Sequence, residues 1–165
     1  MKKLVTCIVA MMMFFGIGYG QAIKGTYAIK NVQTGLLLRI KDANSKNGTP
    51  IVLYAPQDWK CMTWDFKQVE GNTYQLKNLF SNKTMEALGT EAGTAFNEQP
   101  LEQLKSSQLY DFEPAGKDTY LIKLKGTEQY ITSPGDSEVN TQVILAPKTG
   151  DKSQQWTIYQ QSPTM

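Results

Sequence analysis

The sequence of 165 residues contains no histidine, which excludes several kinds of catalytic and metal site. A Ser-His-Asp triad, a Cys-His nucleophile pair, a histidine-containing zinc site and a haem with a proximal histidine all need that side chain. Two cysteines are too few for a zinc ribbon or an iron–sulfur cluster within one chain. The sequence therefore indicates no cofactor and no metal site.

Arginine is nearly absent as well, since Arg39 stands alone among sixteen lysines. The formal net charge is only +2, which gives no basic surface of the kind that binds nucleic acid. We therefore expect no nucleic-acid partner. The classes that remain are a binding module, an enzyme based on carboxylates or on serine and lysine, and a protein-interaction module.

Residues 1–20 have the three-part pattern of a secretory signal peptide. Lys2 and Lys3 precede an apolar run at 4–17, and Gly18 and Gly20 place small residues before a cleavage point at Gln21. The run is shorter than the roughly 20 residues of a membrane span, although an uncleaved anchor is the alternative. We expect an exported protein, periplasmic or secreted and of bacterial type, with no membrane span in the mature chain.

The mature chain, residues 21–165, is predicted to form one domain. Removing the leader takes away two lysines and no acid, so 15 basic residues face 15 acidic ones and the domain is neutral. Cys61 is then the only cysteine, which excludes an intramolecular disulfide. A single core at this length is large enough to hold such a domain together.

Three landmarks recur with a period of about 46 residues, which indicates an internal repeat. They are TYAIKN, TYQLKN and TYLIKL at 26–31, 73–78 and 119–124; WDF, YDF and WTI at 64–66, 110–112 and 156–158; and TPI, TAF and TQV at 49–51, 94–96 and 141–143. Nearly the whole mature chain belongs to these three units.

Each unit has the pattern of four short strands. In the first, large apolar residues alternate in Tyr27-x-Ile29 and Trp64-x-Phe66, whereas 36–40 is an apolar run that contains Arg39 and 51–54 is β-branched and aromatic. Turn-forming residues such as Asn47-Gly48 separate them. Twelve strands in three equal units predict an all-β fold that is closed with threefold symmetry.

The landmarks resemble the ricin-B-type β-trefoil lectins. The resemblance rests on Gly-Thr-Tyr-x-Ile-x-Asn at 25–31, on Gly-Thr-x-Ile at 48–51 and on the Gln-x-Trp signature at 154–156. Residues 78–95 are similar to mushroom lectins of this family. The resemblance to this family implies a β-trefoil fold and non-catalytic carbohydrate binding, with a sugar as the partner.

The resemblance also implies one shallow sugar site per unit, built from four positions. These hold an aspartate after the second strand, an aromatic after the third, an asparagine or histidine, and the glutamine of Gln-x-Trp. The corresponding residues are Arg39, Tyr54, Cys61 and Met62 in the first unit, Glu86, Gln99, Ser107 and Gln108 in the second, and Thr132, Ala146, Ser153 and Gln154 in the third. No unit has both the acid and the aromatic, so we expect partly degenerate sites.

The candidate ligand residues of the second unit are Glu86, Gln99 and Gln108. Those of the first unit are Arg39 and Tyr54, together with Trp59 in the following loop. Arginine binds carboxylate or sulfate, so this pocket suits an acidic sugar. A surface ion pair with Asp42 is the alternative for Arg39, and folding back onto the barrel is the alternative for Trp59.

The aromatic residues that recur in every unit are expected to form core layers. They are Tyr27, Tyr74, Tyr120, Trp64, Tyr110 and Trp156. No pair of carboxylates has a spacing that marks a glycosidase, so we expect no catalytic residue. A protein-binding scaffold, such as a protease inhibitor that uses loops, is the alternative function. The oligomeric state is not indicated.

Overall fold

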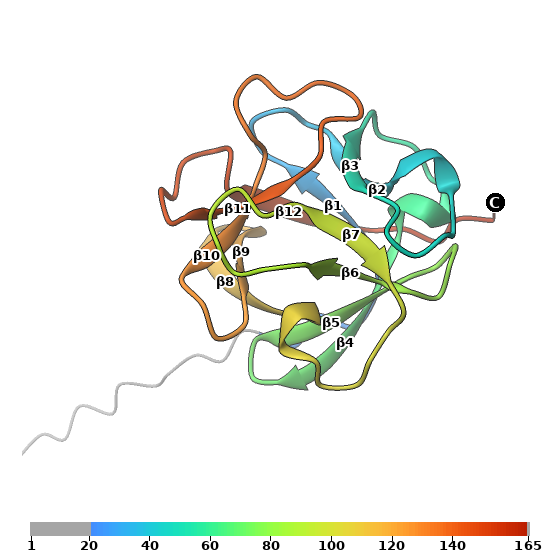
Figure 1. Cartoon of the computed structure of the whole chain (residues 1–165), viewed down its shortest axis with the longest axis horizontal. Helices are drawn as coiled ribbons and strands as arrows, with labels where there is room; N and C mark the ends of the chain where they lie inside the picture. The colour runs from blue at the N-terminus through green and yellow to red at the C-terminus, as the bar shows by residue number, and fades with distance from the viewer. Residues whose placement is uncertain (1–20, 165) are drawn as a thin grey trace, which may run out of the picture.

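The computed structural model describes residues 21–164, so the predicted signal peptide lies outside the described residues. This part of the chain contains twelve strands and three short 3₁₀ turns (Figure 1), which confirms the all-β prediction. The elements are β1 (Gly25–Asn31), β2 (Leu37–Ile40), η1 (Lys41–Ala43), β3 (Ile51–Tyr54), η2 (Lys60–Met62), β4 (Trp64–Glu70), β5 (Thr73–Asn78), β6 (Thr84–Ala87), β7 (Phe96–Gln99), η3 (Ser106–Gln108), β8 (Leu109–Gly116), β9 (Thr119–Leu124), β10 (Gln129–Thr132), β11 (Ile144–Pro147) and β12 (Gln155–Gln160).

Half of the strands in residues 21–164 form a closed antiparallel ring. β1 pairs with β4, β4 with β5, β5 with β8, β8 with β9, β9 with β12, and β12 pairs again with β1. Each strand of the ring therefore has a partner on both sides, which protects its backbone from pairing with another chain. Figure 1 shows the first and last strands, β1 and β12, side by side.

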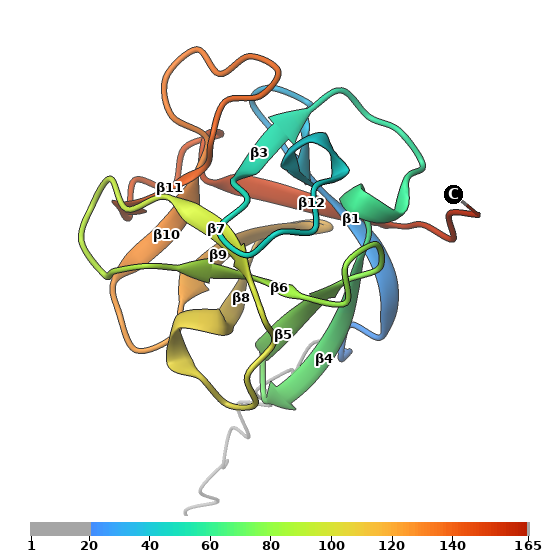
Figure 2. The same cartoon turned by 45° about the vertical axis from the view of Figure 1, so that its right-hand side comes forward.

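The remaining strands of the described chain form three antiparallel hairpins, β2–β3, β6–β7 and β10–β11. Figures 1 and 2 show the β6–β7 hairpin lying across the molecule. Isolated bridges join the hairpins pairwise, between Pro50 and Asn97, Ala95 and Ile144, and Val52 and Gln142. A ring with three hairpins related in this way is a β-trefoil, as the sequence predicted.

One buried aromatic side chain per unit connects the ring to a hairpin. Trp64, Tyr110 and Trp156 are fully buried near the start of the fourth strand of their units, as predicted. The Trp64 indole donates to the Leu38 carbonyl at 3.4 Å, the Tyr110 hydroxyl to that of Met85 at 2.9 Å, and the Trp156 indole to that of Ile131 at 2.9 Å. Buried donors need such partners, so these bonds fix each hairpin against the ring.

The other recurring aromatics occupy the end of the ring that carries the β4–β5 and β8–β9 turns. Tyr74 is buried, as predicted, and its ring lies edge-on against Phe66 and Phe112. Tyr27 and Tyr120 are only half-buried and line a cavity of about 710 Å³. The expectation of a core layer therefore holds for Tyr74, whereas the other two tyrosines form the wall of an open mouth.

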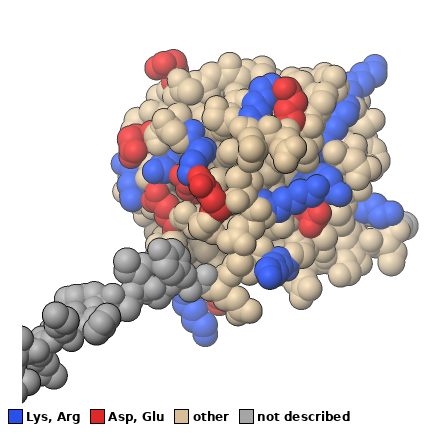
Figure 3. All heavy atoms as spheres, turned by 90° about the horizontal axis from the view of Figure 1, so that it is seen from below, with Lys and Arg blue, Asp and Glu red and all other residues tan. Residues whose placement is uncertain are grey.

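Charges of both signs are mixed on the surface. Figure 3 shows lysines beside acidic side chains on the face seen from below. Lys125, for example, lies 3.1 Å from Glu70 and 3.7 Å from Asp111. Residues 21–164 include no helix that is long and apolar enough to cross a membrane.

Glu98 is a buried acid whose charge the protein compensates only in part. Its side chain on β7 is fully buried, and neither carboxylate oxygen has a hydrogen-bond partner among the described residues. Burial raises the pKa of Glu98 above its ordinary value, and the nearby Ser81 and Lys83 lower it only in part. The folded protein therefore binds a proton here more readily than the unfolded chain, and its stability falls as the pH rises from the ordinary pKa of glutamate through the raised one.

We expect Glu98→Met to increase the free energy of unfolding at pH 7 by about 1–3 kcal/mol, because it removes an unsatisfied buried group of similar size. Chemical denaturation at pH 4 and pH 7 measures this. The increase in unfolding free energy relative to the unaltered protein should be larger at pH 7 than at pH 4. The control Glu91→Met, at an exposed position, should leave the unfolding free energy unchanged. A loss of stability at pH 7 would contradict the interpretation.

Candidate functional site

The second unit presents an acidic side chain at the position where the family carries aspartate. Glu86 lies in β6 opposite Asn97 of β7, and its side chain is 9% exposed. The residue before it, Met85, is the one whose carbonyl accepts the Tyr110 hydroxyl. This buried hydrogen bond fixes the position of β6 relative to the ring. Because successive side chains of a strand point to opposite faces, Glu86, the next residue, points away from the core.

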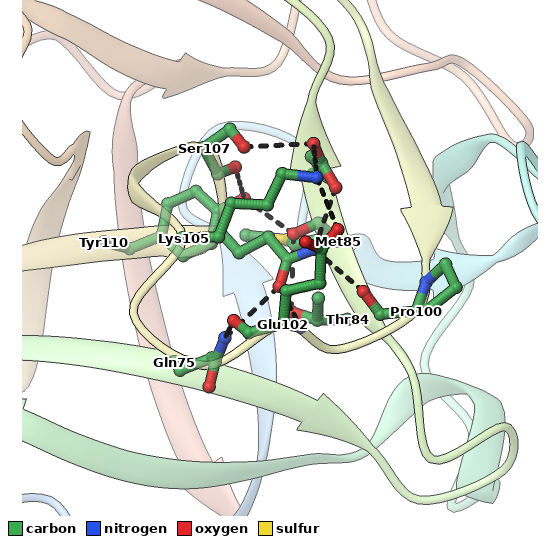
Figure 4. Close-up of polar contacts among 10 residues, drawn as sticks. Gln75, Thr84, Met85, Pro100, Glu102, Lys105, Ser107 and Tyr110 are labelled. Atoms are coloured by element: carbon green, nitrogen blue, oxygen red, sulfur yellow. Dashed lines mark hydrogen bonds and ion pairs between the residues drawn. The ribbon is translucent and has the colours of Figure 1, made fainter.

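Three side chains from the segment before β8 hold the Glu86 carboxylate. Gln108 Nε2 donates to Oε2 at 2.8 Å, Ser107 Oγ donates to Oε1 at 3.0 Å, and Lys105 Nζ lies 3.0 Å from Oε1. Figure 4 shows Lys105 and Ser107 side by side on the same loop. One lone pair on Oε2 remains available for a hydroxyl group of a ligand.

The Glu86 carboxylate is ionised well into the acid range. Burial by itself raises its pKa, but the hydrogen bonds from Gln108, Lys105 and Ser107 outweigh that effect, so the pKa of Glu86 lies below its ordinary value. Each of these bonds favours the charged form. A permanent anion at this position is a strong acceptor for sugar hydroxyl groups.

A cavity of about 260 Å³ opens beside Glu86. Its wall is formed by residues 86–90, by Ser106 and Ser107, and by Leu124 and Lys125 from the third unit. Leu88 stands in this wall with 60% of its surface exposed. The cavity therefore combines a charged acceptor with an exposed apolar side chain, which is the pairing that a sugar ring requires for its hydroxyl groups and its C–H groups.

Gln108 organises this corner of the molecule. Its side chain is fully buried, and Oε1 accepts hydrogen bonds from the Glu102 amide at 2.9 Å and from Gln75 at 3.2 Å. Its Nε2 donates to Glu86 and to the Pro100 carbonyl at 2.9 Å (Figure 4). All four hydrogen-bonding positions of the amide are used within the protein, so Gln108 positions Glu86. The sugar contact expected of it stays a prediction.

The third unit repeats this arrangement without the acid. Gln154 accepts from the amides of Thr149 and Gly150, and it donates to the Thr132 hydroxyl at 3.1 Å and the Pro147 carbonyl at 2.8 Å. Thr132 occupies the place of Glu86, and its neutral hydroxyl group donates to the Tyr130 carbonyl at 2.9 Å. In the first unit Met62 takes the place of the glutamine and has no amide to make these bonds.

The aromatic position of the second unit contributes little to the cavity. Gln99 pairs with Thr84, near the end of β7, and does not line the cavity. Leu88 and Lys105 do contribute to the site, although the sequence analysis did not select them. No spacing pattern marks them, because they lie in two irregular loops, one after β6 and one before η3.

The first unit brings its three candidate residues together. Tyr54 pairs with Leu37, which places it diagonally across the β2–β3 hairpin from Arg39. The Arg39 guanidinium carbon lies 4.1 Å from the centre of the Tyr54 ring and 5.8 Å from that of Trp59. Arg39 is buried, 8% exposed, and its ion pair with Asp42 is long, 3.9 Å. Trp59 packs on the core and lies 6.1 Å from the Tyr54 ring, so it folds back onto the barrel, and a contact with a ligand stays a prediction.

The ring and the three hairpins define the class of the protein as a β-trefoil. A family model described as the ricin-type beta-trefoil lectin domain-like family matches residues 15–104, more than half of the chain. The protein therefore belongs to this family, as the sequence resemblance indicated. Among curated proteins, the comparison finds no matching relative.

Solved structures confirm the fold. The designed threefold-symmetric protein ThreeFoil superposes with a TM-score of 0.79 at 17% identity, over 82% of this chain and 99% of that one. The Macrolepiota procera ricin B-like lectin, in complex with lactose, gives 0.69 at 22% identity over 84% and 98%. An exo-β-1,3-galactanase from Clostridium thermocellum gives 0.75 at 19% identity, over 81% of this chain but only 30% of that one.

If Gln108 and Gln154 hold their loops as described, each Gln→Ala replacement should lower the free energy of unfolding by about 1–3 kcal/mol, because buried partners lose their hydrogen bonds. Thermal and urea denaturation measure this. Gln160→Ala, at an exposed position, is the matched control and should leave stability unchanged. Equal stability of all three variants would show that the amide networks contribute nothing.

Proposed function

We propose that the protein is a non-catalytic carbohydrate-binding module that acts mainly through the second-unit cavity. The observation that carries this proposal is the Glu86 carboxylate, held by three side chains at the wall of a cavity of about 260 Å³. Membership of a lectin-like family supports it, and so does the lactose-bound state of the Macrolepiota procera neighbour.

The remaining features of the proposal follow from the sequence. The leader pattern at 1–20 supports export, to the periplasm or outside the cell. The loss of the acid in the third unit and of the aromatic in the second supports partly degenerate sites. The galactanase neighbour matches this chain over 30% of its own length, which supports a role as a binding module rather than as an enzyme.

Binding of the protein to an array of neutral glycans is the direct test, with Leu88→Asp as the main variant. Leu88 is exposed in the cavity wall, so the replacement should abolish most binding, by about ten-fold or more, without affecting the core. Leu104→Asp is matched to it, because Leu104 is equally exposed, 62%, but lies outside the cavity wall.

The expected result is binding to at least one neutral sugar class that Leu88→Asp removes and Leu104→Asp retains. Glu86→Gln should weaken the same binding by about ten-fold, because the amide replaces a charged acceptor. No binding above background at high protein concentration would overturn the proposal, and inhibition of a protease panel would then favour the protein-interaction alternative.

The pH dependence of binding gives a separate check on Glu86. Because its pKa lies below the ordinary value for glutamate, about 4.3, affinity for the selected glycan should stay constant from pH 7 to pH 5 and fall only below that ordinary value. Titration calorimetry over this range measures it. A midpoint above pH 5, in protein that circular dichroism shows to be folded, would contradict the role of Glu86.

A further inference from the structure

The first unit contains a buried arginine, Arg39, that the neutral-sugar site of the second unit does not explain. The Arg39 guanidinium is nine-tenths buried, yet its Nε has no hydrogen-bond partner among the described residues. Arg39 forms an ion pair with Asp42, whose side chain is 68% exposed. The distance from Arg39 Nη2 to Asp42 Oδ1 is 3.9 Å, which is too long for a hydrogen bond. A buried charge with so little compensation is costly unless a ligand completes it.

Within residues 21–164, Asp42 is the only acid that forms an ion pair with Arg39. The Cys61 thiol lies beside Arg39, and burial raises its pKa above the ordinary value even though the guanidinium acts in the opposite direction. The thiol is therefore neutral at pH 7 and leaves the guanidinium charge in place. Arg39 is also the single arginine of the chain, so this charge is not part of a general basic surface.

The aromatic side chains orient the guanidinium without using its hydrogen-bonding edge. Tyr54 lies 4.1 Å from the guanidinium carbon, at the distance of a cation–π contact, and Trp59 lies 5.8 Å away. An arginine that stacks on an aromatic ring keeps the edge of its planar group for hydrogen bonds. The donors are thus held in a fixed plane and need little rearrangement to bind an anion.

We propose that Arg39, Tyr54 and Trp59 form a second site, which binds the carboxylate of an acidic sugar residue. A carboxylate matches the two parallel donors of a guanidinium fork, and the Tyr54 and Trp59 rings offer apolar surface to the C–H face of the sugar. Asp42, held at the rim with a left-handed backbone, φ 54°, repels a carboxylate and so limits the affinity. This site shares no residue with the Glu86 cavity and does not rest on it.

The single arginine makes the test direct, because the protein has one arginine Nε–H signal in a ¹H–¹⁵N spectrum. The probes are tri-galacturonate, its methyl ester and N-acetylneuraminic acid. The expected result is a saturable shift of the Arg39 Nε–H signal and of the Trp59 indole signal with an acidic probe, and none with the ester. This comparison uses the unaltered protein and needs no variant to fold.

Variants separate this site from the neutral-sugar cavity. Arg39→Gln should weaken binding of the acidic probe by about ten-fold or more, and Arg39→Lys should recover only part of that loss. Asp42→Asn should increase the affinity for the acidic probe. Lys67→Gln, which removes a positive charge at an exposed position of β4, is the matched control. Glu86→Gln should leave acidic-sugar binding intact, which distinguishes failure of one site from failure of the other.

Equal shifts with acid and ester would overturn the proposal, and so would unchanged affinity in folded Arg39→Gln. Equal affinity for acetate and for the acidic sugars would remove the role assigned to Tyr54 and Trp59. Binding of galacturonate alone or of the sialic acid alone would support the site and identify the source of its carboxylate.

Discussion

One hydrogen bond, made once in each unit, joins the closed ring to the hairpin of that unit. A buried aromatic donor near the start of the fourth strand reaches the carbonyl of the second strand: Trp64 to Leu38, Tyr110 to Met85 and Trp156 to Ile131. The bond couples two separate parts of the fold, the closed ring and the hairpin. A donor buried this deeply has no water to replace its partner, so the hairpin has one position of low energy.

The residue that follows the accepting carbonyl is the one that determines the chemistry of each unit. It is the cation Arg39 in the first, the anion Glu86 in the second and the neutral hydroxyl of Thr132 in the third. The backbone is equivalent in the three units, because Leu37, Thr84 and Tyr130 pair with Tyr54, Gln99 and Ala146 in the same register. One scaffold therefore holds three different hydrogen-bonding groups at the same place.

Much of the fold could be predicted from the sequence, because its signals are local and repeat three times. The strand at 51–54 was predicted with the bounds that β3 has, and the aromatic pattern of Trp64, Tyr110 and Trp156 indicated burial correctly. The half-buried state of Tyr27 and Tyr120 could not be predicted, since it depends on how the ring opens beside the turns. The alternation of apolar and polar residues shows which face of a strand is buried, but it does not show how close a residue lies to the open end of the barrel.

The candidate site was predictable in part. The resemblance selected Glu86 and Gln108, and the structure joins them at 2.8 Å, but only the hydrogen-bond network shows that Gln108 is saturated within the protein. Lys105 and Leu88 come from loops whose course no sequence pattern defines. The burial of Arg39 was also not visible, because it requires β3 and the η2 turn to be in place around it.

The closure of the ring has a consequence for how the pockets arise. Each fourth strand pairs with the first strand of the next unit, and β12 pairs with β1, so contacts between residues 27–31 and 156–160 are as much a part of the structure as any turn. A single unit cut from the chain would leave each of its outer strands with one neighbour instead of two. Such distant pairings make folding slow compared with that of a helical bundle. The cavity beside Glu86 shows this dependence, because Leu124 and Lys125 of the third unit complete a wall that the second unit begins.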